Sequence, residues 1–218
     1  MITWEDLTDL VKTRRSIRKF KKKPVPEDLL VRALELATWA PNGGNHQAWR
    51  FLIVTNRELI QQIGDAVKSK TELIASWPEA DKFGEVVSRW LKNSEFFREA
   101  PACIAVLMGK YSSIADRILL AREEEDPIAQ EIRMYREIGR SSLQSAAAAI
   151  TYICLILHFF GLGTTWMTGP LQAKKEIEQL LDVPPEWDFV GLIPVGYSDE
   201  IPEPPPRKPI GDVIKFFR

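Results

Sequence analysis

The spacing of hydrophobic residues predicts a chain of helices and strands. Apolar residues recur every three or four positions in four stretches that we expect to be helices: 4–11, 27–40, 57–68 and 173–181. Short continuous apolar runs predict buried strands at 49–54, 102–108 and 189–195. Residues 70–100 and 111–140 are less regular, and we expect helices with exposed aromatic or charged side chains there. Apolar segments recur from end to end without a linker, so we expect one domain over residues 1–218.

Local signals mark the ends of several elements. Thr3 and Asp6 have the spacing of a capping box that opens the first helix. Asn56 is suited to cap the third helix. Pro41 cannot continue a helix, so the second helix should end near Ala40. The residues that follow, Pro41–Asn45, include two glycines and two asparagines, which predicts a loop.

The stretch from Ser141 to Ala173 contains no Asp, Glu, Lys or Arg. Its first part, Leu143–Leu162, has nearly the length of a membrane-spanning helix. The alternative is a helix buried in the core or at a subunit interface, where the small residues Ala146–Ala149 would allow close packing. Neither flank carries the compact cluster of Lys and Arg that is typical of a membrane anchor. We therefore expect a buried central or interface helix and no membrane partner.

Composition and charge narrow the function classes. The chain has 218 residues, of which 45% are hydrophobic, and a net charge of −1. A nucleic-acid-binding protein is more often basic overall, so we expect no nucleic acid partner. Cys103 and Cys154 lie in apolar runs and there are only two histidines, so the sequence predicts neither a disulfide framework nor a metal site. The N-terminal residues lack the features of a signal peptide, which favours a cytoplasmic protein.

The basic stretch Arg14–Lys23 contains seven Arg or Lys residues among ten. Arg14, Arg15 and Arg18 flank a small hydroxyl residue and an apolar one. In an extended segment, Ile17 would enter the core and the guanidinium groups would face a bound anion. Arginine suits that role because its planar group grips phosphate with two hydrogen bonds. A solvated charged face is the alternative explanation of such a run.

Three further polar loops interrupt the apolar pattern, at 41–45, 165–169 and 207–208. Together with 14–18, they suit a planar polar ligand with an anionic tail. Arginines would bind the tail and the ring carbonyls, and glycine-rich backbone could approach the ring closely. Each loop taken singly has a simpler explanation as a turn. The chain has no Walker loop and no dinucleotide-binding glycine motif, so the set favours a cofactor site of another kind.

Four short motifs occur in order from residue 14 to the C-terminal region. They are Arg14–Arg18 (RRSIR), Ala40–Phe51 (APNGGNHQAWRF), Gly161–Trp166 (GLGTTW) and Pro206–Pro209 (PRKP). Together they resemble the nitroreductase superfamily of FMN-dependent oxidoreductases. The resemblance implies an α+β, nitroreductase-like fold with a mostly antiparallel central sheet wrapped by helices. It also implies a homodimer with FMN sites at the interface and the long apolar helix at its centre.

The resemblance further implies which residues bind FMN. They are Arg14, Arg15, Ser16, Ile17, Arg18, Pro41, Asn42, Gly43, Asn45, Met167, Thr168, Gly169, Arg207 and Lys208. The first segment would contact the phosphate, the ribityl chain and the pyrimidine edge, and the second would approach from the partner subunit. Residues 167–169 would lie beside the flavin N5 and O4, and Arg207 would bind the phosphate. No catalytic side chain is implied, because the flavin carries the redox chemistry.

Two residues depart from the pattern of the superfamily. Asn42 stands where the family commonly has Ser, and Ala48 stands where it commonly has Pro. Asn42 can still donate a hydrogen bond, so flavin binding is compatible with the change. The departures bear on the hydrogen bonds near the ring and therefore on its redox tuning.

The activity implied by the resemblance is reduction of a nitroaromatic, a quinone or a similar small acceptor, with NADH or NADPH as the electron donor. The reduced nicotinamide would transfer hydride to the flavin and leave, and the acceptor would then bind at the same place and be reduced. Within the superfamily, reductive dehalogenation is an alternative, because Thr168–Leu171 is similar to the deiodinase branch, and flavin cleavage for cobalamin-ligand synthesis is a more remote one. From another class, the chain could be a non-enzymatic flavin-binding protein. Residues 70–100 and 111–140 should set substrate choice, with Trp77, Phe83 and Trp90 either covering the flavin or packing a lid against the body.

Overall fold

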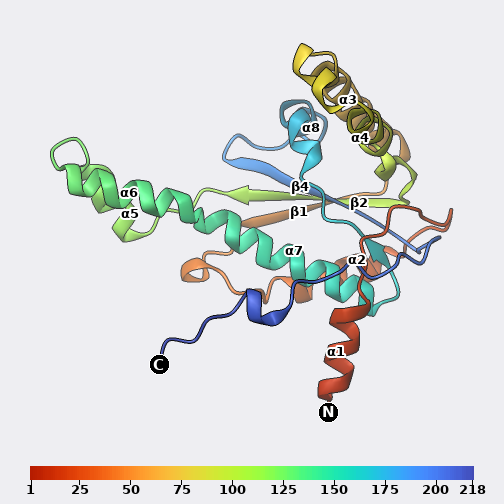
Figure 1. The fold of residues 1–218 in the computed structure, drawn as a ribbon, viewed down its shortest axis with the longest axis horizontal. Coiled ribbons are helices and arrows are strands. Elements are labelled where there is room, and N and C mark those ends of the chain that lie inside the picture. Colours follow the sequence, from red (N-terminus) through yellow and green to blue (C-terminus); the bar gives the residue numbers. More distant parts are fainter.

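A four-stranded antiparallel sheet separates two layers of helices in the computed structural model, which describes residues 1–218 (Figure 1). Helices α3, α4 and α8 lie on one side of the sheet, and α2 and α7 lie on the other. The strands, in the spatial order β1-β2-β4-β3, are β1 (Trp49–Val54), β2 (Ala102–Gly109), β3 (Gly163–Thr164) and β4 (Trp187–Gly196). This arrangement confirms the expected α+β class with a mostly antiparallel sheet.

Eight α-helices and five short 3₁₀ helices (η) surround the sheet. The α-helices are α1 (Trp4–Thr13), α2 (Glu27–Ala37), α3 (Arg57–Ala75), α4 (Glu85–Asn93), α5 (Ile114–Arg122), α6 (Pro127–Gly139), α7 (Ser141–Phe159) and α8 (Lys174–Leu180). The 3₁₀ helices are η1 (Gly43–Asn45), η2 (Pro78–Phe83), η3 (Phe96–Glu99), η4 (Gly169–Ala173) and η5 (Ile210–Asp212). Every strand predicted from the sequence is present, and only the two-residue β3 was not predicted.

Two helix ends differ from the sequence predictions by three residues or more. Helix α2 ends at Ala37 instead of Ala40, because the Thr38 hydroxyl donates to the carbonyl of Glu35 (2.7 Å) and closes the last turn. Helix α3 continues to Ala75 instead of residue 68, since no Gly or Pro interrupts residues 69–75. The predicted capping box of α1 is confirmed by reciprocal hydrogen bonds between Thr3 and Asp6, at 2.9 and 3.1 Å.

The central strand β2 is buried on both faces, which explains its continuous apolar sequence. Successive side chains of a strand point to opposite faces of the sheet. Residues 102, 104 and 106 accordingly pack against α2 and α7, whereas residues 103, 105 and 107 pack against α3 and α8. A strand buried on both faces therefore lacks the alternation of apolar and polar residues that a half-exposed strand shows.

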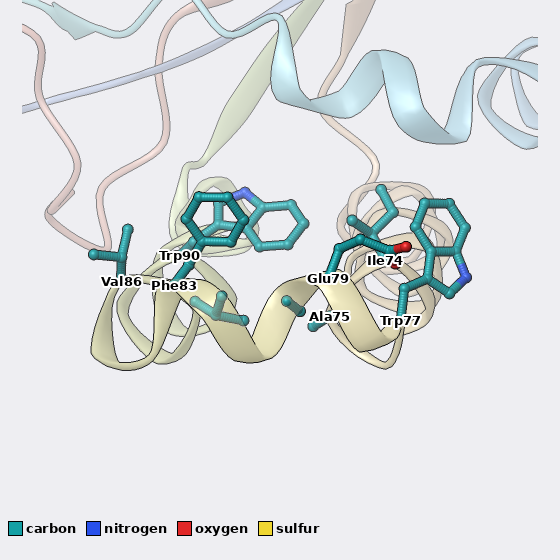
Figure 2. A pocket seen from close by; sticks show the side chains of 9 residues that line it. Ile74, Ala75, Trp77, Glu79, Phe83, Val86 and Trp90 are labelled. Carbon is teal, nitrogen blue, oxygen red and sulfur yellow. The ribbon is translucent and has the colours of Figure 1, made fainter.

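Residues 70–100 and 111–140, whose sequence patterns are less regular, form helices in two separate parts of the molecule. The end of α3, η2 and α4 enclose a small apolar pocket (Figure 2). Helices α5 and α6 form a hairpin that projects from the body (Figure 1), joined by an ion pair between Asp116 and Arg136 (2.5 Å). Arg140, in the left-handed conformation (φ 40°), separates α6 from α7.

The helical run Pro127–Phe159 is long and apolar enough to cross a membrane by length and composition alone, but core helices pass the same test. Seven residues of α7, among them Ala149 and Ile153, are buried within the chain. On its other face Tyr152 and Phe159 are 39% and 73% exposed. Within one chain, α7 is therefore buried on one face only.

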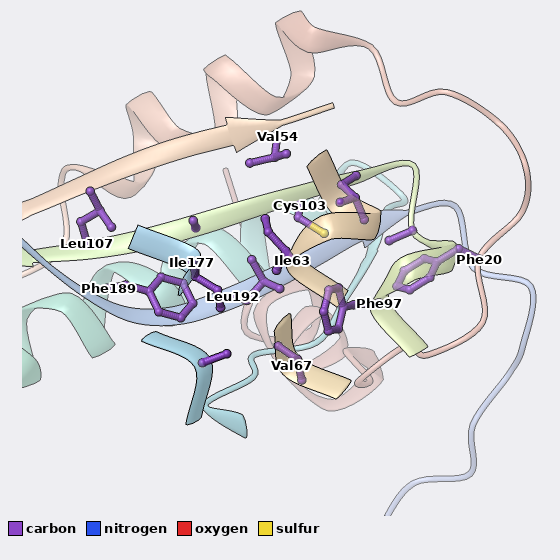
Figure 3. Close-up of a cluster of buried hydrophobic side chains, with 14 of the residues drawn as sticks. Phe20, Val54, Ile63, Val67, Phe97, Cys103, Leu107, Ile177, Phe189 and Leu192 are labelled. Atoms are coloured by element: carbon purple, nitrogen blue, oxygen red, sulfur yellow. The ribbon is translucent and has the colours of Figure 1, made fainter. Parts of the chain in front are cut away.

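The core on the α3 and α8 side carries the segment that bears the predicted site. Figure 3 shows Phe97, Phe189 and Leu192 packed together with residues of α3. Phe20 joins this cluster from the basic stretch, and Ile17 belongs to it as well. The hydrophobic core thus fixes the backbone from which Arg14, Arg15 and Arg18 project.

Candidate flavin site

The segment Arg14–Arg18 lies alongside β3 at the edge of the sheet. Ser16 and Thr164 form an isolated parallel bridge, and the amide of Ile17 donates to the carbonyl of Thr164 (2.9 Å). The hydroxyl of Thr165 in turn donates to the carbonyl of Ile17 (2.6 Å). Ile17 is only 6% exposed, as the sequence predicts for an anchor.

Gly163 allows this close approach between the two segments. A Cβ atom at residue 163 would lie 2.6 Å from Cγ1 and 2.8 Å from Cβ of Ile17. Such distances are far shorter than a normal contact between carbon atoms. The second glycine of the GLGTTW motif, Gly163, is therefore needed because Ile17 occupies the space where a side chain would be.

Glu200 holds the other end of the arginine segment. Its Oε1 accepts hydrogen bonds from the backbone amides of Arg18 (2.5 Å) and Lys19 (3.0 Å). The amide of Asp199 donates to the carbonyl of Lys19 (3.0 Å). Because backbone groups make these bonds, they fix the segment without engaging its guanidinium groups.

Arg14 and Arg15 line a cavity of about 470 Å³ together with His158 and Thr164. No salt bridge involves either arginine or Arg18, and the Nε of Arg15 is buried without a hydrogen-bond partner. A buried donor without a partner is unfavourable by about 1–3 kcal/mol. Glu200 and Glu203 also line the cavity and supply negative charge at its rim. An anion in the cavity would supply the countercharge that Arg14 and Arg15 lack within the chain.

His158 joins the cavity from α7, where its Nε2 lies 2.9 Å from the hydroxyl of Thr13. Burial, together with the positive charges of Arg14 and Arg15, lowers the pKa of His158, while Asp9 acts in the opposite direction. No spacing in the sequence connects residue 158 with Arg14, so only the fold shows that they share a cavity.

The loop Met167–Gly169 lies on the same edge of the sheet as the arginine segment. Met167 pairs with Leu192 of β4 through two backbone hydrogen bonds, of 2.9 and 3.0 Å. Gly191 makes room for it, because a Cβ there would lie 3.3 Å from the carbonyl oxygen of Met167. Thr168 and Gly169 are exposed and lead into η4. The structure therefore places residues 14–18 and 167–169 on adjoining segments, and their role in binding a flavin stays a prediction.

The predicted loop Pro41–Asn45 lies elsewhere. The amide of Gly43 donates to Oγ of Ser145 near the start of α7 (3.3 Å), and Tyr111 packs against Gly43 and Gly44. His158, which lines the cavity beside the arginine segment, is 13 residues further along the same helix. At 1.5 Å per residue the two ends are about 20 Å apart. One chain therefore does not bring residues 41–45 to the arginine segment.

Arg207 and Lys208 also lie outside the cavity. Both are exposed on the C-terminal tail, and Arg207 donates only to the carbonyl of the adjacent Pro206 (3.3 Å). Residues 200–204 of the same tail do line the cavity. A role for Arg207 or Lys208 in phosphate binding stays a prediction.

Comparisons with known proteins agree with this geometry. Residues 11–197 match the model described as the nitroreductase family. The chain belongs to the nitroreductase family. Among family relatives, the iodotyrosine deiodinase of Thermotoga neapolitana is 30% identical over 216 residues, which cover 95% of both chains. The putative NAD(P)H nitroreductase YfhC of Bacillus subtilis is 27% identical over 206 residues, covering 94% of this chain and 91% of that protein.

Solved structures of this family share the fold. A BluB-like flavoprotein from Clostridium difficile 630 superposes with a TM-score of 0.85 at 26% identity, covering 97% of this chain and 99% of the other. An iodotyrosine deiodinase bound to FMN and 3-iodo-L-tyrosine superposes with a TM-score of 0.72 at 28% identity, covering 97% and 98%. The similarity therefore extends over the whole fold, including the segments that form the candidate site.

Replacing Gly163 by Ala should displace Ile17 and loosen the arginine segment. We expect the free energy of unfolding to fall by about 1–3 kcal/mol, the usual effect of overpacking a core. Urea denaturation at one fixed protein concentration would measure it. Gly211→Ala is the control, because a Cβ there meets nothing within 4 Å. Equal stability of the two variants would show that contact with Ile17 does not require a glycine at residue 163.

The lowered pKa of His158 makes the stability of the fold depend on pH. In the unfolded chain the imidazole takes up a proton near its ordinary pKa of 6.5, whereas the folded chain resists protonation. The unfolded state is therefore favoured as the pH falls below that value. Replacing His158 by Gln should weaken the decrease in unfolding free energy between about pH 7 and pH 5. An identical pH dependence of variant and native protein would contradict this assignment.

Proposed function

We propose that the chain is an FMN-dependent oxidoreductase that uses a reduced nicotinamide to reduce a small acceptor such as a nitroaromatic or a quinone. The observation that carries the proposal is the position of Arg14, Arg15 and Arg18, none of which has an ion-pair partner, next to the loop Met167–Gly169. The family membership and the FMN bound by a structural relative at 28% identity support it.

The residues present suit the chemistry of FMN. Its phosphate is a dianion, and Arg14 and Arg15 line one cavity with a buried N–H of Arg15 that has no partner. Arg18 lies over the ring of Phe96 (5.8 Å) and does not line that cavity, so we assign it to the flavin ring instead of the phosphate. When bound, FMN supplies the redox chemistry, and the chain supplies orientation and a positive field that favours negative charge on the ring.

We infer a homodimer in which Pro41–Asn45 of one chain completes the site of the other. A site that contains both segments needs two chains, since α7 holds them about 20 Å apart. The exposed face of α7 and the tail residues Phe216 and Phe217, 73% and 86% exposed, offer apolar surface for such an interface.

Reductive deiodination is the second candidate, supported by the 30% identity with the Thermotoga neapolitana protein. A non-enzymatic flavin-binding protein is the third. Anaerobic mixing of the FMN-loaded protein with NADH or NADPH tests the first candidate, because an oxidoreductase with this donor should reduce its flavin and lose the yellow absorbance. Turnover of 4-nitrophenol, 4-nitrobenzyl alcohol or a quinone, compared with turnover of 3-iodo-L-tyrosine, separates the first two. Absence of bleaching with both donors would overturn the proposed reaction.

Replacing Arg18 by Ala should weaken FMN binding about tenfold or more, the effect of losing one charge-assisted hydrogen bond. Lys22→Ala is the matched control, because Lys22 is exposed in the same basic stretch and forms no hydrogen bond or ion pair. Fluorescence titration of the FMN-free protein with FMN measures both dissociation constants. Equal losses in the two variants would mean that the whole stretch acts as a diffuse positive surface.

A further inference from the structure

His158 is the one imidazole that lines the cavity beside the arginine segment. It lies in the last turn of α7, and Arg14 and Arg15 line the same cavity. Protonation of a histidine is unfavourable beside two positive charges unless negative charge is also present. The ring therefore marks a place where a proton and an anion would bind together.

Two hydrogen bonds at the end of α1 show which nitrogen of His158 carries the proton. The hydroxyl of Thr13 donates to the carbonyl of Asp9 (2.7 Å), and Nε2 of His158 lies 2.9 Å from the same hydroxyl oxygen. A hydroxyl group has only one proton to donate, so its oxygen accepts from His158 and Nε2 is protonated. A neutral imidazole has one protonated nitrogen. Nδ1 is therefore the free acceptor of the neutral ring, and no group of the chain bonds to it.

The same end of α1 holds Arg15 in place. Its Nη1 donates to the carbonyls of Lys12 (2.5 Å) and Arg14 (2.8 Å). Carbonyl groups carry no net charge, so these bonds orient the guanidinium without neutralising it. The last turn of α1 thus fixes both a positive group and an imidazole at one cavity, the imidazole through Thr13.

Charges of both signs surround the ring of His158. The negative groups are Asp9 of α1 and, on the tail that lines the cavity, Glu200 and Glu203. The positive groups are Arg14, Arg15 and, on α2, Arg32, which lies over the ring of Phe160 (5.3 Å) near the end of α7. Burial and the charges of Arg14 and Arg15 outweigh Asp9 and keep the pKa of His158 below its ordinary value of 6.5. The ring is therefore mainly neutral at about pH 7 when no anion is bound.

We propose that His158 binds the phosphate of the flavin and takes up a proton at Nδ1 when that phosphate binds. The identity of the anion rests on the proposed function, whereas the tautomer of the ring rests on the structure alone. A phosphate dianion would offset the charges of Arg14 and Arg15, which disfavour protonation of the ring. The protonated Nδ1 could then donate a charge-assisted hydrogen bond to a phosphate oxygen. His158 would thereby distinguish FMN from riboflavin, which has no phosphate.

Proton uptake at His158 makes the affinity for FMN depend on pH. A group that is more basic in the complex than in the free protein favours the complex as the pH falls. Between about pH 8 and pH 6.5 we therefore expect the dissociation constant of FMN to decrease, by at most about tenfold per pH unit. Near pH 6 the phosphate itself takes up a proton and acts in the opposite direction, so the comparison is made above that value.

Nitrogen NMR of the native protein detects this proton directly. In protein labelled with ¹⁵N-histidine only His46 and His158 give imidazole signals, and the His46→Gln variant shows which signals belong to His158. The two nitrogens of a neutral ring differ in chemical environment, whereas both carry a proton in an imidazolium. At about pH 7 we expect a neutral ring protonated at Nε2 without ligand and an imidazolium with saturating oxidised FMN. Riboflavin should leave the neutral ring unchanged.

Titration calorimetry of the FMN-free protein measures the contribution of His158 to binding. In His158→Gln the new amide can still donate to Thr13 but cannot take up a proton. We expect this variant to bind FMN about tenfold more weakly and riboflavin equally well. In two phosphate-free buffers with different ionisation enthalpies, the native protein should take up more protons per FMN than His158→Gln.

Glu203→Gln is the matched variant, because it removes a negative charge from the same cavity. It should strengthen FMN binding severalfold, which is the opposite direction, and should still show proton uptake. The NMR experiment needs no change at residue 158, so it tests the proposal even if His158→Gln folds poorly.

A neutral ring of His158 in the FMN complex would overturn the proposal. So would equal FMN affinity and equal proton uptake in native protein and His158→Gln. Failure of the proposed reaction is a separate result, because none of these measurements uses a nicotinamide. It would appear as no bleaching by NADH or NADPH while FMN still converts His158 to the imidazolium. A native protein that binds no FMN would overturn both.

Discussion

The length of α7 sets the arrangement of the candidate site. Thirteen residues along one continuous helix separate Ser145, which contacts Gly43, from His158, which lines the cavity with Arg14. The helix is packed against α2 and the sheet along most of this distance, so it acts as a rigid spacer of about 20 Å between the two ends. One chain alone therefore does not bring the two segments together, which is the basis of the homodimer proposed above.

A second constraint operates at the edge of the sheet. Ile17 fills the space that Gly163 leaves open, and Glu200 binds the amides that follow it. The backbone is thereby fixed while the guanidinium groups of Arg14 and Arg15 face a cavity without a carboxylate bound to them. Two arginines on one cavity without ion-pair partners leave positive charge that a bound anion would neutralise.

Sequence patterns predicted the parts of the fold that depend on local chemistry. The capping box of Thr3 and Asp6, the loop after Ala40 and the apolar run of β2 each follow from a few adjacent residues. The predicted end of α3 at residue 68 was wrong, because residues 69–75 carry no helix-stopping signal and the next helix-breaking residue is Pro78. The proximity of His158 to Arg14 was missed because it depends on how α7 crosses the sheet. Residues 41–45 were recognised as a candidate site segment, but their distance from Arg14 follows only from the packing of α7.

Subunit complementation tests most directly the claim that two chains build each site. One chain would carry Arg14→Ala with Arg18→Ala, and a second, differently tagged chain would carry Gly44→Val, which distorts the loop because Gly44 has φ +59°. Each homodimer should bind little FMN. The purified heterodimer should bind about one FMN per two chains, because one of its sites takes the intact arginine segment from one chain and the intact loop from the other. A heterodimer as poor in FMN as both homodimers would show that each site is formed within a single chain.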